Sequence, residues 1–227
     1  MILCAAGAAV NRKETAFLKQ ETEKQIQSDL RIRDAYQEGS QEPDAFVLST
    51  INPDYRAFLD FDSGLIRLPI VQSSNNSYYL DHLFDGSEGI TGTLFFDVQC
   101  EAEDQVKLIY GHSVFDEPSL MFTPLHQLLD AQFLETNRSF RLITRTGTEH
   151  YDIMAVLIND EEDPACLNTR IRSFADQQEE YAWLRDVMRR SAVSPDTSLT
   201  GKERILILQT CMKAEGEERL CVVAVEK

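Results

Sequence analysis

The sequence predicts a mainly β fold with helical additions (α+β), organised as a closed or nearly closed β-barrel. After Pro53 the chain carries about eight apolar, β-branched runs separated by clusters of Gly, Asp, Asn and Ser, a spacing typical of a sandwich or barrel. Two helical segments interrupt these runs. The length of 227 residues and the hydrophobic content of 43% favour one large domain, or one domain with an appendage, around a sizeable core.

The N-terminal part differs from the expected barrel. Residues 1–10 (MILCAAGAAV) are apolar but too few to span a bilayer, which needs about 20 residues, and they lack the basic start of a secretory signal. They fit a helix start or an expression remnant as well as the end of a membrane anchor. Residues 12–37 are polar and free of Gly and Pro, which predicts a solvated helix with a thin apolar stripe, and residues 39–43 (GSQEP) end it.

The expected strands follow in order along the chain. Residues 57–61 (AFLDF) and 66–71 (IRLPIV) flank Asp62-Ser63-Gly64, a punctuation typical of a hairpin. The other expected strands are rich in β-branched and aromatic residues, and they cover residues 91–98, 106–110, 139–144, 150–158, 204–209 and 220–225.

Two inserted helices are expected. Residues 119–134 carry Leu and Phe at near-helical spacing, with Pro124 marking a helix start or a break between short helices. Residues 173–190 form the second, with Ser173 as the expected N-cap and Asp176 near the first turn. This long helix stands before a run that ends in a cysteine, where a barrel needs only a short turn, and such insertions usually serve a binding surface.

The composition excludes several kinds of function. The chain holds 22 Lys and Arg against 38 Asp and Glu, and the formal net charge of −16 would repel a phosphate backbone, which disfavours nucleic-acid binding. Five cysteines contain no CxxC pair, so a disulfide framework is not expected and at least one thiol should be free. The four histidines form no HExxH array, and we expect neither a metal nor a cofactor.

Three residues at strand ends are candidates for acyl transfer. Cys211 ends an apolar run before a polar loop, where a nucleophile is rigidly held yet reachable. His112 follows Gly111 at another strand end, where it can act as general acid or base and help to hold a thiolate. Arg219 begins the last run, and across one hairpin turn its guanidinium can approach the thiol and stabilise an oxyanion. Taken singly, they are equally compatible with a buried cysteine, a turn histidine and a surface arginine.

Several motifs occur in a fixed order around these candidates. They are Tyr110-Gly111-His112, the Leu-x-Thr-Cys pattern of residues 208–211 and Arg219 at the opening of a final strand, and together they resemble a sortase. The resemblance is closest to class B and covers about residues 44–225. Four further segments carry the match to that class: Asn52-Pro53-Asp54, residues 69–72 (PIVQ), residues 76–82 (NSYYLDH) and the helix at 173–190.

The resemblance implies a cysteine transpeptidase of the Gram-positive cell surface, with an eight-stranded barrel and helices packed at its amino end. Such enzymes cleave a C-terminal sorting motif after Thr and hold the protein as a thioacyl intermediate. In that scheme Cys211 attacks, His112 carries the protons and Arg219 supports the oxyanion or the substrate. The implied peptide groove includes parts of the insertion between residues 159 and 195, together with Asn76, Leu80, Gln209 and Thr210.

The resemblance also implies partners and a location. The substrates would be surface proteins or pilins with a C-terminal sorting signal, and the acceptor an amine of a peptidoglycan precursor or of a pilin lysine. An N-terminal membrane helix would make residues 1–10 the remnant of an anchor, residues 11–43 a helical stalk and residues 44–227 the catalytic domain. We therefore expect a single-pass protein of the cell membrane, with its catalytic domain on the extracellular face.

Two departures from the class B pattern concern the site. Gln209 stands where class B commonly has serine, and Lys213 stands where some members carry an acidic residue, so no carboxylate partner is assigned. The remaining histidines and cysteines are expected to be structural or without a catalytic context. These residues are His82, His126, His150, Cys4, Cys100, Cys166 and Cys221. Because side chains alternate between the two faces of a strand, Cys221 shares a face with Arg219, and a redox role stays open for it.

Two other functions remain open. A cysteine hydrolase or peptidase would use the same three residues and pass the acyl group to water, because that choice depends on the shape of the groove and on water access. A noncatalytic binding domain of the cell surface would carry a degenerate site, and the intact His112, Cys211 and Arg219 argue against it.

Overall fold

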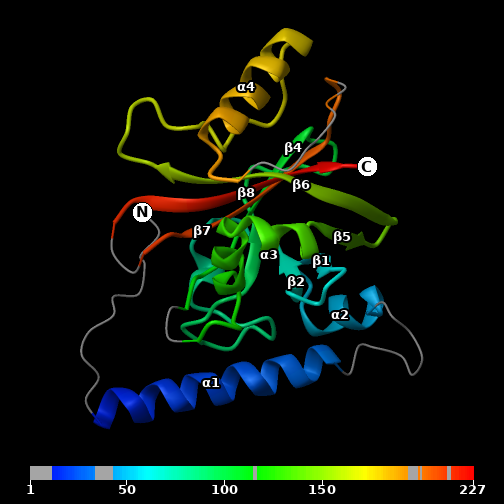
Figure 1. Ribbon diagram of the computed structural model, residues 1–227. Coiled ribbons are helices and arrows are strands. Elements are labelled where there is room, and N and C mark those ends of the chain that lie inside the picture. Colours follow the sequence, from blue (N-terminus) through cyan, green and yellow to red (C-terminus); the bar gives the residue numbers. More distant parts are fainter. Residues whose placement is uncertain (1–11, 34–42, 115–116, 194–198, 200, 214–215) are drawn as a thin grey trace.

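The computed structural model describes residues 12–33, 43–114, 117–193, 199, 201–213 and 216–227. Within them, eight strands form a closed barrel in the order β1-β2-β3-β4-β7-β8-β6-β5 (Figure 1). The prediction of a mainly β barrel with helical additions is confirmed. The strands are β1 (Tyr55–Phe61), β2 (Arg67–Val71), β3 (Leu94–Phe96), β4 (Val106–Tyr110), β5 (Ser139–Thr144), β6 (Thr148–Asp160), β7 (Ile205–Cys211) and β8 (Glu218–Glu226).

Local sequence signals account for most strand boundaries. β1 and β2 pair antiparallel across the predicted hairpin, and Gly64 there has φ of 78°, a conformation that glycine adopts without strain. β3 is shorter than the strand expected at residues 91–98. The reason is a turn in which the Cys100 N–H donates to the Asp97 carbonyl at 2.9 Å, so the extended chain ends at Phe96.

The pairing of distant strands determines where the site lies. β4 is parallel to β7, with Tyr110 opposite Gln209 as the last paired residues, and β8 lies antiparallel between β7 and β6. Every residue of β7 is buried, because one face of the strand fills the barrel and the other is covered. Parallel strands end at the same edge, so the chain segments that follow β4 and β7 emerge together at one end of the barrel.

Helices lie in both segments where the sequence predicted insertions, and α2 (Ala45–Ile51) is a further helix that the sequence analysis did not predict. The segment expected at residues 119–134 divides at Asp130, whose carboxylate accepts a hydrogen bond from the Phe133 N–H at 2.8 Å and caps the second helix. The helix expected from Ser173 begins later, because Asp176 rather than Ser173 caps it by accepting from the N–H groups of its first turn. The helices are α1 (Arg12–Arg33), α2 (Ala45–Ile51), η1 (Tyr78–Leu80), η2 (Thr123–Leu129), α3 (Ala131–Thr136) and α4 (Gln177–Arg190).

The polar helix α1 runs along the side of the molecule opposite α4 (Figure 1). Polar contacts attach it to the loop before β3: Glu21 accepts from the Ile90 N–H at 3.1 Å, and Gln25 accepts from the Thr91 hydroxyl. Among the described residues, none of the helices combines the length and the apolar character that crossing a bilayer requires. The anchor expected at residues 1–10 lies outside the described residues.

Candidate active site

The three candidate residues meet at one end of the barrel. Cys211 and Arg219 are opposite each other in the antiparallel ladder of β7 and β8, so their side chains leave the sheet on the same face. His112 lies two residues beyond the end of β4, and the Gly111 N–H donates to the Gln209 carbonyl at 3.2 Å, which draws this segment toward β7. A Cβ at position 111 would overlap Leu94 and Phe122, so only glycine permits this close approach.

A hydrogen bond at one ring nitrogen orients the His112 side chain. The Nε2 atom lies 2.7 Å from the Leu80 carbonyl oxygen, and since a carbonyl only accepts, Nε2 carries the proton and Nδ1 is the nitrogen that can exchange one. Burial lowers the pKa of His112, and this effect exceeds the opposite effects of the Leu80 carbonyl and the Asp81 charge. The imidazole is therefore mainly neutral at pH 7.

Cys211 is buried, with 4% of its surface exposed. Cys100, Cys166 and Cys221 are free thiols, in agreement with the expectation that at least one thiol is free. Nucleophilic attack requires the thiolate form of Cys211.

Arg219 is not the surface arginine that was one interpretation of the sequence, because only 1% of its surface is exposed. Its Nη1 donates to the carbonyls of Gly216 and Glu218 at 3.0 and 3.2 Å, and its Nη2 donates to Glu217 Oε2 at 2.8 Å. Its Nε lies 3.3 Å from Glu161 Oε2 without the alignment of a hydrogen bond. Two carboxylates therefore balance this buried charge.

Glu161 is the carboxylate that the sequence did not identify. It lies just after β6, and Gln209 Nε2 donates to its Oε1 at 3.3 Å, so one carboxylate contacts both Arg219 and Gln209. The only signal in the sequence is the acidic turn at residues 160–163 (DEED), which resembles any solvated loop. The register of β6 and β8, with Asn159 opposite Arg219, brings this turn beside the arginine.

Ser113 and His126 form a second group at the site that the sequence did not identify. Ser113 is buried, and its Oγ lies 2.8 Å from His126 Nε2 and 2.9 Å from Thr210 Oγ1, and donates to the Cys211 carbonyl at 3.1 Å. The sequence assigned His126 a structural role because it stands among leucines. Its proximity to Cys211 depends on the fold of η2, which no local pattern indicates.

The four residues predicted to bind peptide lie in different surroundings. Leu80 contacts the site through its carbonyl, Gln209 is buried between Glu161 and the Cys221 thiol, and Thr210 is buried against Ser113. Asn76 contacts the segment just after β3: its Nδ2 donates to Asp97 Oδ2 at 2.9 Å, and its Oδ1 accepts from the Val98 N–H at 2.7 Å. Peptide binding by these four residues stays a prediction.

The remaining histidines and cysteines have contacts of their own. His82 stacks on Tyr78 with ring centroids 4.0 Å apart and contacts Asp81 Oδ1 through Nδ1 at 2.7 Å. His150 is exposed on β6. Burial raises the pKa of the Cys221 thiol, the reverse of what a reactive thiol needs. Within the described part of the chain, no group of three or more His, Cys, Asp or Glu side chains could hold a metal ion.

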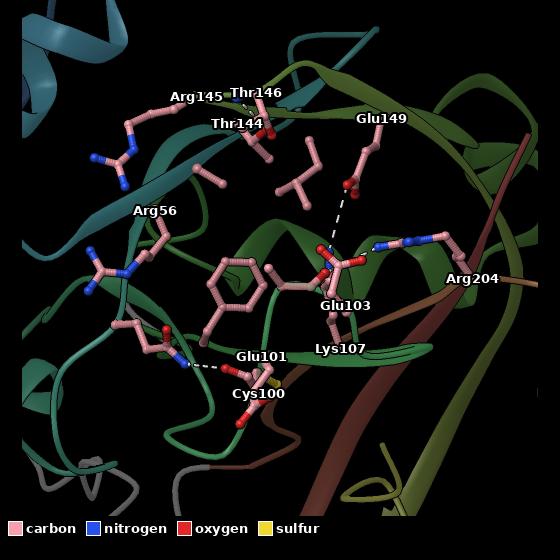
Figure 2. A pocket seen from close by; sticks show the side chains of 15 residues that line it. Arg56, Cys100, Glu101, Glu103, Lys107, Thr144, Arg145, Thr146, Glu149 and Arg204 are labelled. Atoms are coloured by element: carbon pink, nitrogen blue, oxygen red, sulfur yellow. Dashed lines mark hydrogen bonds and ion pairs between the residues drawn. The ribbon is translucent and has the colours of Figure 1, made fainter. Parts of the chain in front are cut away.

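A separate cavity of about 580 Å³ opens elsewhere on the barrel (Figure 2). Lys107 near the start of β4 and Arg204 just before β7 line it, and Lys107 Nζ lies 3.7 Å from Glu149 Oε1 on its wall. These positions are at the opposite ends of β4 and β7 from His112 and Cys211, and neither of those two residues lines the cavity. This cavity is therefore not the candidate active site.

No family model matches this chain. Known proteins resemble it in sequence, and solved structures resemble it in fold. The sortase B of Listeria monocytogenes is 28% identical over 175 residues, covering 76% of this chain and 68% of that protein. The sortase B of Staphylococcus aureus is 25% identical over 182 residues, covering 79% and 72%. The structure of Clostridium perfringens sortase B gives a TM-score of 0.71 at 27% identity, covering 79% of this chain and 97% of that one. A Staphylococcus aureus sortase B in complex with substrate gives a TM-score of 0.74 at 22% identity, covering 96% and 99%, a likeness in fold.

Proposed function

We propose that this chain, which is a class B sortase by sequence and fold, cleaves a C-terminal sorting motif after Thr and transfers the protein to an amine. The main support is the meeting of Cys211, Arg219 and His112 at one barrel end, two of them opposite each other in a ladder and the third on the adjoining strand end. A thiol, a proton carrier and a buried cation on rigid elements are the set that acyl transfer requires.

The proposed reaction has two halves. The Cys211 thiolate attacks the threonine carbonyl carbon, a C–S bond forms, and the C–N bond breaks as the leaving amine takes a proton from Nδ1 of His112. In the second half an acceptor amine attacks the thioester and gives a proton to Nδ1, a C–N bond forms, and the C–S bond breaks to restore the thiolate. The Arg219 guanidinium stabilises the oxyanion of each tetrahedral intermediate.

The lowered pKa of His112 bears on both halves. A neutral imidazole is ready to accept a proton from the incoming amine, as the second half requires. The first half requires the imidazolium, which is a minor form at neutral pH. Because thiol and imidazole titrate as a coupled pair, the active fraction is the one in which Cys211 is ionised and His112 is protonated.

The substrates and the location belong to the same proposal. The substrates are surface proteins or pilins with a sorting signal, and the acceptor is an amine of a peptidoglycan precursor or a pilin lysine. A sortase B structure complexed with triglycine, 21% identical to this chain, makes that peptide a reasonable first acceptor to test. Residues 1–10 would be the remnant of a membrane anchor, residues 11–43 a stalk, and residues 44–227 a catalytic domain outside the cell.

Mass spectrometry of the reduced protein with sorting-type pentapeptides tests this function. We expect a thioacyl adduct on Cys211 that triglycine, diaminopimelate or a lysine peptide resolves to a new amide, and no adduct on Cys211→Ala. An adduct that only water resolves would indicate the cysteine hydrolase instead. The absence of an adduct across a library of peptides would refute the proposed chemistry.

A further inference from the structure

The ladder between β4 and β7 stops before it reaches the reacting groups. Its last paired residues are Tyr110 and Gln209, and within the described chain the bond from the Gly111 N–H to the Gln209 carbonyl is the final backbone hydrogen bond between the two segments. His112 and Cys211 both lie beyond this point. Their relative position therefore depends on side-chain contacts between the segments that carry them.

Ser113 supplies those contacts. Its hydroxyl reaches Thr210 Oγ1 at 2.9 Å and donates to the Cys211 carbonyl at 3.1 Å, so it bonds to the two residues that follow the end of the ladder on β7. Ser113 is also the residue directly after His112. One buried side chain thus joins the backbone of the proton carrier to the backbone of the nucleophile.

The protons of this cluster fix the direction of each bond. A hydroxyl has one proton and two lone pairs, and a carbonyl only accepts. If Ser113 donates to Cys211, it must accept from the Thr210 hydroxyl and from His126 Nε2, which lies 2.8 Å away. His126 is then the Nε2–H tautomer and saturates the serine, so all three partners hold the hydroxyl in one orientation.

The chain around His126 is folded to hold it there. The Phe122 N–H donates to the His112 carbonyl at 2.9 Å, and the Val114 N–H donates to Thr123 Oγ1 at 2.8 Å, so two hydrogen bonds attach η2 to the segment after β4. Burial lowers the pKa of His126, and this effect exceeds the opposite effect of the nearby Cys211 backbone. The ring is therefore mainly neutral at pH 7, as a single-proton donor to Ser113 should be.

We propose that Ser113, oriented by His126, is a positioning residue for the acyl transfer at Cys211. Its hydrogen bonds take the place of backbone hydrogen bonds beyond the last paired residues of β4 and β7. They fix the position of the Cys211 carbonyl, and with it the direction of the Cys211 side chain, relative to His112. Ser113 and His126 act through Cys211 and His112 and do not touch the substrate. The inference rests on the proposed transpeptidase function for its kinetic part alone.

Two measurements test this role. The first is the rate at which iodoacetamide alkylates reduced Cys211 between pH 5 and 9, followed on the Cys211 peptide by mass spectrometry; it needs no sorting peptide. In Ser113→Ala we expect the midpoint of this profile to move to higher pH, because a less well placed His112, in its protonated form, stabilises the thiolate of the coupled pair less. The second is acylation by a cleaved peptide, where we expect kcat to fall about tenfold and KM to change by less than about twofold.

The variants are chosen so that loss of folding does not decide the outcome. Ser113→Thr keeps the hydroxyl and His126→Gln keeps an N–H donor, so both should retain most of the wild-type rate, whereas His126→Ala should resemble Ser113→Ala. The double variant Ser113→Ala with His126→Ala should be no slower than Ser113→Ala, because the two residues act as one unit. Ser139→Ala is the matched control: its hydroxyl donates to Asp152 Oδ1 at 2.5 Å at the opposite end of the barrel.

Each result decides between positioning and a general effect on structure. A wild-type alkylation profile in Ser113→Ala, or an equal loss in Ser139→Ala, would overturn the proposal. It would also fail if Ser113→Thr were as slow as Ser113→Ala. If the wild-type protein cleaves no peptide, the proposed function fails, and the alkylation profiles alone still decide whether Ser113 positions Cys211.

Discussion

The substitution Arg219→Lys tests how the buried cation is held. In the structure the guanidinium makes three hydrogen bonds, to Gly216, Glu217 and Glu218, and approaches Glu161. An ammonium on a flexible stem can replace one of them at best. Bonds from a charged donor contribute about 1.5–3 kcal/mol each, and the lower value applies because the Glu161 and Glu217 side chains are 29% and 36% exposed, where water screens them. Losing two bonds should lower the free energy of unfolding by about 3 kcal/mol.

Urea unfolding followed by circular dichroism, with reductant present, measures this change. In a thermal melt the midpoint should fall by roughly 6–12 °C, since 1 kcal/mol corresponds to about 2–4 °C in a domain of this size. Arg189→Lys is the control, because that side chain is 69% exposed and pairs with Asp186, so its loss should stay below about 0.5 kcal/mol. Equal stability of the two variants would refute the claim that the several hydrogen bonds of the Arg219 guanidinium stabilise the fold.

Two further outcomes are expected. With reductant, His112→Ala should lower the acylation rate by about 10²–10⁴-fold, measured in single-turnover mass spectrometry, and a loss below tenfold would remove His112 as the proton carrier. Burial lowers the pKa of His112 and of His126 in the folded protein, so below neutral pH the unfolded chain binds more protons than the folded one. The free energy of unfolding should therefore be highest above a pH of about 6.5, the pKa of histidine in the unfolded chain. It should decrease as the pH falls from there through the lower pKa values of the two histidines in the folded protein. Urea titrations at pH 7.5 and 5.5 check the sign, and replacing both histidines by Gln should reduce the difference.

The sequence could predict what depends on neighbours along the chain. Alternation and β-branched runs located the strands, and the approximate places of α4 and of the η2–α3 pair followed from helical spacing. The position of Cys211 opposite Arg219 also followed, since a single short turn joins β7 to β8. The place of His112 was reached through a family resemblance, because nothing local indicates that β4 pairs with β7.

The rest of the site depends on pairings between distant strands. Glu161 meets Arg219 only through the register of β6 and β8, and Ser113 meets Cys211 only because β4 and β7 are parallel neighbours across a long crossover. Residues such as Ser113 and His126 carry no local sign of this, since a serine after a strand and a histidine among leucines are common in any fold. The predicted first residue of α4 was wrong for a related reason. Ser173 and Asp176 both suit an N-cap, and the direction of the chain after β6 decides between them.

The order of strands in the barrel makes the reaction centre a late product of folding. β8 follows every other strand in the chain yet lies between β6 and β7, where it supplies Arg219 and pairs along the whole of β7. Until β8 is inserted, β6 and β7 expose unpaired edges; the pairings of β6 with β8 and of β4 with β7 span long sequence separations, and such contacts form slowly. Cys211 and Arg219 come together within the local β7–β8 hairpin, but His112 joins them only when β4 pairs with β7, so a chain whose barrel has not closed lacks the proton carrier of the proposed reaction.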